Sequence, residues 1–145
     1  MAETLGSLCD KLTIIKLKQY HTDDIVRTKS LNEQLFNLIN EIDGFIENSI
    51  AGKIPLNKLT FKANKVFKQK GNETRDFKGS IGNIFSNLAE INCLLWHEQE
   101  KVFEFETVPI EEKDIVVKKL AILNLERNKC IDEIDDSLIQ FILKQ

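Results

Sequence analysis

Apolar residues recur at spacings of three and four over four long stretches of the chain, residues 4–21, 23–50, 80–106 and 110–143. This spacing follows the 3.6 residues per turn of an α-helix and gives each helix one apolar face to bury. The 145 residues include only 6 Gly and 2 Pro, too few for the many tight turns of a sheet-rich domain. We therefore expect an all-α fold: an antiparallel helical bundle of four long helices plus a short basic helix.

The breaks between these stretches are short or contain residues that stop helices. Thr22 and Asp24 can start the second helix, and Pro109 ends the third because it removes an amide donor and clashes with the preceding turn. Gly44 lies inside the second stretch and marks a weak point or a close approach of another helix. Since the length suits one hydrophobic core, residues 1–145 are predicted to form a single domain.

The middle of the chain is basic. Residues 51–80 contain 8 basic and 2 acidic side chains, although the whole chain has a formal net charge of −3. The overall acidity disfavours nucleic-acid binding. The short basic helix would place four lysines on one face, which is either a solvated surface or a docking strip for an acidic protein or an anionic ligand. They are Lys58, Lys62, Lys65 and Lys68.

Cysteine usage and hydropathy predict the compartment. Cys9, Cys93 and Cys130 are far apart in the sequence and form no CxxC motif, which is typical of reduced thiols in a cytosolic protein. No apolar run approaches the roughly 18 residues that a membrane span needs. The first residues, MAETLGSLCDKL, lack the basic and apolar segments of a signal peptide. We expect a cytoplasmic protein without a membrane span.

Polar side chains interrupt the apolar stripes of three predicted helices. An unpartnered amide or guanidinium that faces a core costs several kcal/mol, so these groups must meet other polar groups, water or a ligand. For the positive charge of Arg127, Asp10 is the first candidate partner and Glu98 the second. The candidate ligand-binding residues are Asp10, Asn92, His97, Gln99, Asn124, Arg127 and Asn128.

Two interpretations of this polar layer remain open, provided that the helix phase is right. The layer is either a hydrogen-bonded network that fixes helix register or a pocket for a small polar or anionic ligand, with Arg127 as the anion clamp. The two histidines, His21 and His97, form no HxxxH pair, so we expect no metal and no cofactor. No catalytic nucleophile stands out, because no Ser or Cys has a recognisable motif around it.

Three stretches form distinctive motifs: TLGSLCDKLTI at residues 4–14, NCLLWHE at 92–98 and LNLERNKCIDEID at 123–135. Together they resemble a bacterial all-helical family of unknown function. The sequence departs from the family at Gln99, where the family has an acidic residue, so no role that needs a carboxylate there is expected. Members are often encoded beside genes for sugar transfer and surface-polysaccharide assembly. The resemblance therefore implies a cytoplasmic helper or enzyme of that pathway.

The predicted function is a non-enzymatic binding or accessory module linked to cell-surface carbohydrate assembly. The alternative is a small enzyme or ligand-binding domain that uses the interior layer of Asp10, Asn92 and Arg127 for an anionic or sugar-nucleotide ligand. In either case the long apolar helix faces predict a homo-oligomer.

Overall fold

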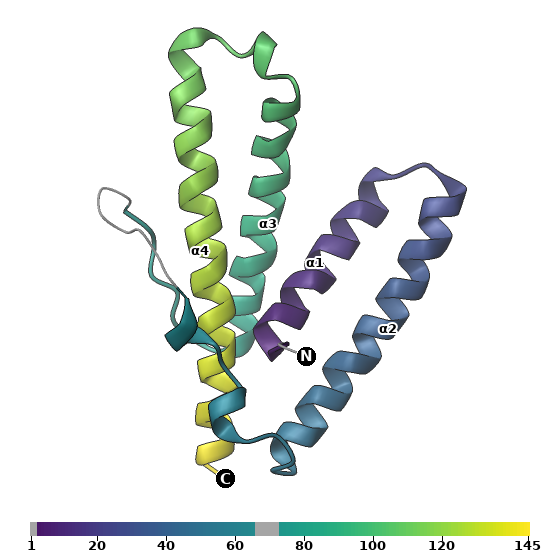
Figure 1. Ribbon diagram of the computed structural model, residues 1–145, viewed down its shortest axis with the longest axis vertical. Helices are drawn as coiled ribbons and strands as arrows, with labels where there is room; N and C mark the ends of the chain where they lie inside the picture. Colours follow the sequence, from purple (N-terminus) through teal and green to yellow (C-terminus); the bar gives the residue numbers. More distant parts are fainter. Residues whose placement is uncertain (1–2, 66–72) are drawn as a thin grey trace.

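The computed structural model describes residues 3–65 and 73–145, and it has four long α-helices that form two antiparallel hairpins (Figure 1). No strand occurs within these two ranges. The all-α prediction is confirmed, and each helix lies within three residues of its predicted ends. The helices are α1 (Leu5–His21), α2 (Ile25–Ile50), α3 (Ile81–Phe103) and α4 (Ile110–Leu143).

Local side chains explain where the helices begin and end. The Thr4 and Ser7 side chains each accept a hydrogen bond from the other residue's backbone amide, which is a capping box at the start of α1. Asp24 caps α2. Gly52 (φ 75°) ends α2 in the left-handed conformation, and the Lys53 amide donates to the Asn48 carbonyl oxygen at 2.9 Å. That hydrogen bond is the 6→1 bond of a Schellman motif.

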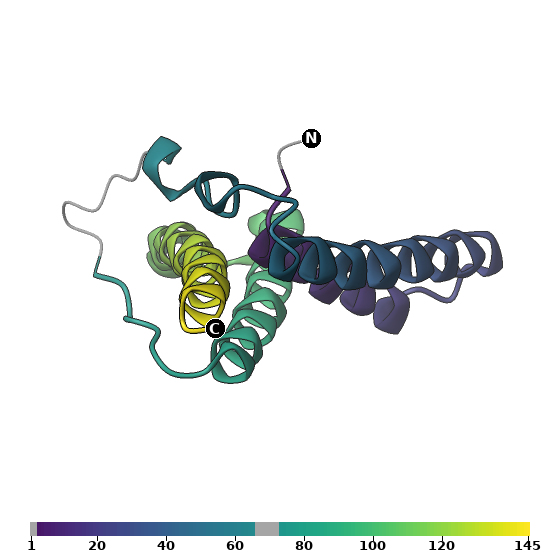
Figure 2. The same cartoon turned by 90° about the horizontal axis from the view of Figure 1, so that it is seen from below.

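The two hairpins meet at one end and diverge at the other. α1 packs on α2, α3 and α4, and α3 packs on α4, whereas α2 packs mainly on α1. The turns of the hairpins therefore lie apart, with a V-shaped opening between them (Figure 1). The view from below shows α1 and α2 projecting away from the α3–α4 hairpin (Figure 2). The helices are paired antiparallel as predicted, but only α1 contacts all three others extensively.

The core lies where α1 crosses the α3–α4 hairpin. It consists mainly of aliphatic side chains from these three helices, because their inward stripes meet there. Gly6 allows the crossing to be close: a Cβ atom there would lie 2.3 Å from the Ile131 carbonyl oxygen. The buried cluster is Leu5, Cys9, Phe77, Ile84, Leu88, Ile91, Leu123, Cys130, Ile131, Ile134 and Leu138.

The segment between α2 and α3 differs from the prediction of a short basic helix. The described part of it, residues 51–65 and 73–80, contains two single 3₁₀ turns, η1 (Leu56–Lys58) and η2 (Lys62–Asn64). A further turn, η3 (Phe105–Thr107), joins α3 to α4. A helix of only a few turns gains too little to offset the free-energy cost of its nucleation, so short turns form instead. The buried side chain of Leu59 anchors this part of the chain. The segment passes around the side of α4 (Figure 2).

The lysines of this segment do not form one free face. Lys62 Nζ lies 3.1 Å from Asp136 Oδ2 and Lys65 Nζ lies 2.5 Å from Asp132 Oδ1, so both lysines pair with α4 of the same chain. Lys58 is exposed, and Lys68 lies outside the described residues. The predicted docking strip is therefore partly used to hold this connection against the α3–α4 hairpin.

Candidate functional site

Asp10 of α1 and Arg127 of α4 form a bidentate ion pair where the hairpins meet. Arg127 Nε donates to Asp10 Oδ1 at 2.8 Å and Nη2 donates to Oδ2 at 2.5 Å. The Asp10 side chain is buried, and 30% of the Arg127 side chain is exposed. The hydrogen bonds to Asp10 raise the pKa of Arg127 above its ordinary value. The first-choice partner of Arg127 is thus confirmed.

Asn92 of α3 hydrogen-bonds to this ion pair and to a second residue of α1. Its Nδ2 atom donates to Asp10 Oδ1 at 2.9 Å and to Thr13 Oγ1 at 2.6 Å, and the Thr13 hydroxyl donates to the Asp10 carbonyl oxygen at 2.8 Å. Thr13 was not among the predicted site residues, and its position one turn after Asp10 is a sequence signal that could have indicated its role. Four polar side chains from three helices therefore converge and hydrogen-bond to one another inside the bundle.

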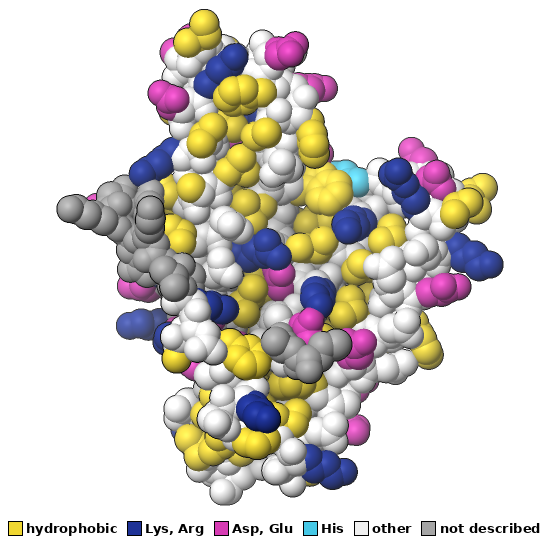
Figure 3. Space-filling model, viewed as in Figure 1, with side chains coloured by type: hydrophobic (Ala, Val, Ile, Leu, Met, Phe, Trp, Pro, Cys, Tyr) yellow, Lys and Arg dark blue, Asp and Glu magenta, His cyan; other side chains and the backbone are white. Residues whose placement is uncertain are grey.

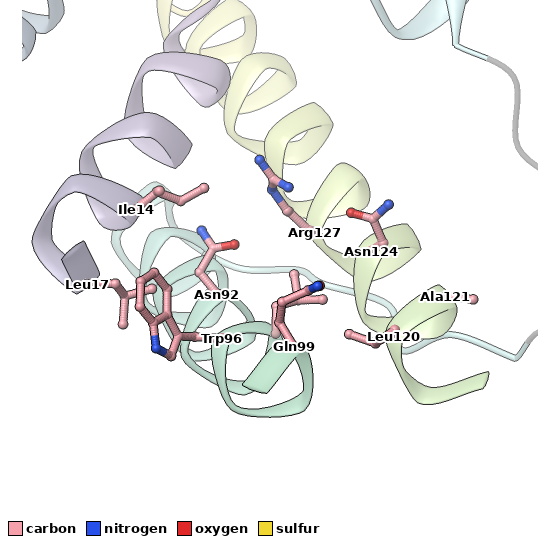
Figure 4. Close-up of a pocket in the computed structure, with 10 residues that line it drawn as sticks. Ile14, Leu17, Asn92, Trp96, Gln99, Leu120, Ala121, Asn124 and Arg127 are labelled. Atoms are coloured by element: carbon pink, nitrogen blue, oxygen red, sulfur yellow. The ribbon is translucent and has the colours of Figure 1, made fainter. Parts of the chain in front are cut away.

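A hollow of about 420 Å³ opens beside this network (Figure 4). Trp96 and Asn92 of α3 form one wall, Asn124 and Arg127 of α4 form the other, and α1 contributes apolar side chains. The hollow therefore combines an aromatic ring, aliphatic groups and a few amides, which is the usual composition of a small-molecule pocket. Its lining is Ile14, Leu17, Asn92, Leu95, Trp96, Gln99, Leu120, Ala121, Asn124 and Arg127.

The seven predicted site residues occupy three kinds of position. Asp10, Asn92 and Arg127 form the network, and Gln99 and Asn124 line the hollow with exposed side chains. Asn128 Nδ2 donates to the Asn124 carbonyl oxygen at 3.1 Å, so this amide bonds within its own helix. His97 is exposed on α3 outside the lining of the hollow.

Glu98, the second candidate partner of Arg127, pairs with other residues. Its side chain is 1% exposed and lies 2.9 Å from Lys119 Nζ and 3.2 Å from Lys101 Nζ. Its Oε2 atom is buried without a hydrogen-bond partner among the described residues. Burial raises the pKa of Glu98, but the hydrogen bonds from Lys119 and Lys101 outweigh this effect, so the pKa is lowered overall. Glu98 thus joins α3 to α4 and takes no part in the network.

The buried thiols are poor nucleophiles. Burial raises the pKa of both Cys9 and Cys130 to about 12, and nearby carboxylates add to the shift. Since the thiolate is the reactive form, neither group would react readily near neutral pH. In the part of the chain that the structure describes, no cluster of three or more His, Cys, Asp or Glu side chains could hold a metal ion.

No family model, curated protein or solved structure matches this chain. The resemblance to a bacterial family of unknown function therefore stays a prediction. None of the helices within the two described ranges is long and apolar enough to cross a bilayer. The functional conclusion depends on the chemistry of the hollow itself.

Proposed function

We propose that this protein is a non-enzymatic binding module whose hollow takes a small, hydroxyl-rich ligand of the carbohydrate class. An indole ring such as that of Trp96 packs well against the apolar C–H face of a sugar. An amide such as Asn124 or Gln99 can donate to one hydroxyl and accept from another. The observation that carries the proposal is this combination of one aromatic ring and several amides in one hollow.

A binding role fits the lining better than catalysis does. Among its ten residues, Arg127 is the only ionisable one, and two of its N–H donors already bond to Asp10. The lining therefore offers no carboxylate, imidazole or thiol for general acid–base or nucleophilic chemistry. Arg127 is also a weak anion clamp, because Asp10 compensates its charge.

The proposed context is a cytoplasmic accessory protein of cell-surface carbohydrate assembly. The three stretches that resemble the bacterial family motivate this context, and a sugar-binding hollow is compatible with it. The alternative of a small enzyme would require that the ligand or a partner supply the acid–base groups that the lining lacks.

Binding can be tested by calorimetry and thermal shift with a panel of neutral hexoses and amino sugars. Trp96→Ala and Asn124→Ala should each weaken binding about tenfold or more, since each removes contact area or a hydrogen bond worth about 1–1.5 kcal/mol. Gln140→Ala removes an exposed amide from the same helix as Asn124 and is the matched control. If no sugar in the panel binds, or if the variants bind as tightly as the control, the proposal is wrong.

We further propose that two copies associate. The chain exposes 9684 Å², whereas a compact monomer of 16.7 kDa exposes about 7,600 Å². The excess, roughly 2,000 Å², is on the scale that each subunit of an obligate homodimer buries. Much of the exposed apolar area lies near the two hairpin turns, where hydrophobic groups gather on the surface (Figure 3). These side chains are Tyr20, Ile25, Val26, Phe103, Ile110, Ile115 and Val117.

Sedimentation velocity at several protein concentrations tests the self-association. Ile25→Glu and Ile115→Glu place a charge on the two exposed apolar turns and should shift the protein towards monomer. Ser86→Glu adds the same charge at an exposed polar position of α3 and should leave association unchanged. A wild-type chain that stays monomeric at tens of micromolar would contradict this part of the proposal.

A further inference from the structure

A second hollow lies next to the first and shares Trp96 with it. It has a volume of about 430 Å³ and is formed by the end of α1, the start of α2 and Trp96 of α3. Because Trp96 lines both hollows, a single ligand that passes the indole could reach from one hollow to the other. The lining is Lys18, His21, Thr22, Arg27, Ser30, Leu31, Gln34 and Trp96.

The second hollow has a different charge from the first. Lys18 and Arg27 line it, and no carboxylate belongs to its lining. Neither side chain takes part in any ion pair found within residues 3–65 and 73–145, in contrast to Arg127, which is bound to Asp10. Asp24, the acidic residue nearest to Arg27 in the sequence, accepts a hydrogen bond on its Oδ1 atom from the Arg27 backbone amide at 3.0 Å, and Asp23 is exposed outside the lining. The two cations are therefore available to an anion.

The rim of this hollow is held by a ring stack. The His21 imidazole lies 4.8 Å from the Trp96 ring, centroid to centroid, with 9° between the planes. The stack fixes the imidazole beside Lys18, which is one turn earlier in α1, so that less entropy is lost when its N–H donates to a ligand. Thr22, Ser30 and Gln34 add neutral donors. A cation pair with several such donors is the set that proteins use to bind phosphoryl oxygens.

We infer that the second hollow binds the phosphoryl group of a phosphorylated sugar whose sugar ring occupies the first. This inference rests on the proposed function for the identity of the ring, and on Lys18, Arg27 and His21 for the phosphoryl group. The ligand class is therefore a sugar phosphate, which includes the sugar end of a nucleotide sugar. It also places the anion-binding role on two residues that the sequence stripes did not single out. One of the two interpretations of the polar layer had given that role to Arg127.

The test compares glucose with glucose 1-phosphate, and N-acetylglucosamine with its 1-phosphate, with inorganic phosphate as the third arm. The phosphorylated form should bind at least tenfold more tightly than the free sugar, because it adds charge-assisted hydrogen bonds. The Lys18→Ala/Arg27→Ala double variant should lose that gain and bind the free sugar as the wild type does. The gain should also shrink at high salt.

The control keeps the same change in net charge. Lys16→Ala/Lys29→Ala removes two exposed lysines from α1 and α2 outside the hollow and should bind the sugar phosphate as the wild type does. If sugar and sugar phosphate bind equally, or if both double variants weaken phosphate binding equally, the inference is wrong while the proposed function stands. If no free sugar binds, and inorganic phosphate binds as tightly as the sugar phosphate, the hollow does not bind the sugar ring. Both the proposed function and the inferred sugar-phosphate ligand are then wrong.

Discussion

The Gly6 amide donates a hydrogen bond of 2.7 Å to Asp135 Oδ1, although the two residues are 129 positions apart. An amide in the first turn of α1, which has no partner within its own helix, is thereby satisfied by a side-chain carboxyl oxygen of α4. The contact also fixes the register of the two helices. One turn further along α1, and two turns back along α4, Asp10 meets Arg127. The contact that caps the first helix therefore helps to place the candidate site.

Replacement of Gly6 by alanine should lower the free energy of unfolding by about 2 kcal/mol or more, because backbone must move to relieve overpacking. The added Cβ would lie 2.3 Å from the Ile131 carbonyl oxygen and 2.9 Å from Asp135 Oδ1. Gly44→Ala is the control, since no atom lies within 4 Å of its Cβ position. It should stabilise the protein by about 0.5–1 kcal/mol through helix propensity. Urea unfolding measures the stability of both variants. Equal changes in the free energy of unfolding would contradict the close crossing of α1 and α4 at Gly6.

The pH dependence of stability should report on Asp135. Burial raises its pKa from 3.8 to about 7, despite the hydrogen bond from Gly6 and the nearby charge of Lys65. The folded protein therefore keeps this proton up to about pH 7, whereas the unfolded chain loses it near pH 4. Because the folded state then binds more protons, the contribution of this group to stability falls as the pH rises from 4 to 7 and is constant above that.

Asp135→Asn isolates this effect from other carboxylates, such as Glu98, whose lowered pKa acts in the opposite direction. The asparagine oxygen can still accept from Gly6 but does not titrate. The stability of the variant relative to the wild type should rise between pH 4 and pH 8 by up to about 4 kcal/mol, which corresponds to three pKa units. A difference that stays constant over this range, measured by urea unfolding at several pH values, would disprove the raised pKa.

The stability of the ion pair between Asp10 and Arg127 can be tested with single and double variants. Asp10→Asn leaves a half-buried guanidinium without its carboxylate and should lower the free energy of unfolding by about 1–3 kcal/mol, less than for a fully buried pair because Arg127 is partly exposed. Arg127→Met in the Asp10→Asn background should restore part of that loss. If the double variant is as unstable as the sum of the two single variants, the pair contributes no coupling energy.

Arg127→Met also separates a structural role from a binding role. The proposed function gives this guanidinium a place in the wall of the hollow but no anion to bind, so sugar binding should weaken by less than tenfold and phosphate binding should be unchanged. Calorimetry with glucose and with glucose 1-phosphate measures both. Loss of the phosphate-dependent gain in this variant would return the anion site to Arg127.

Glu98 pairs with Lys101 and Lys119, and the free energy of unfolding should fall less when the acid is removed than when a lysine is removed. Glu98→Met removes a buried carboxylate whose Oε2 atom has no partner among the described residues, so the stability should stay within about 1 kcal/mol of the wild type or rise. Lys119→Met leaves that carboxylate with Lys101 alone and should lower stability by about 1 kcal/mol, a modest value because Lys119 is half exposed. The opposite order in thermal or urea unfolding would mean that the ion pairs stabilise the hairpin on balance.

The helices could be predicted because their determinants are local. The apolar spacing, the caps at Thr4 and Asp24, and the break at Pro109 all act within a few residues. The stripes also identified Asp10, Asn92 and Arg127, which do meet inside the bundle, although His97 and Asn128 lie outside the hollow. The need of Arg127 for a carboxylate indicated Asp10. These conclusions follow from backbone geometry and from the cost of burying an unpaired charge.

Only the tertiary structure decided how the helices meet and what the polar layer does. A stripe tells which side chains face inward, but the crossing of α1 over α3 and α4 depends on contacts such as Gly6 with Asp135, which join the two ends of the chain. The same crossing opens the hairpins, directs Asn124 into a hollow while Asn128 bonds to its own helix, and brings His21 onto Trp96. Periodicity within one helix carries no information about its angle to another, so the candidate site became visible only when the helices were packed together.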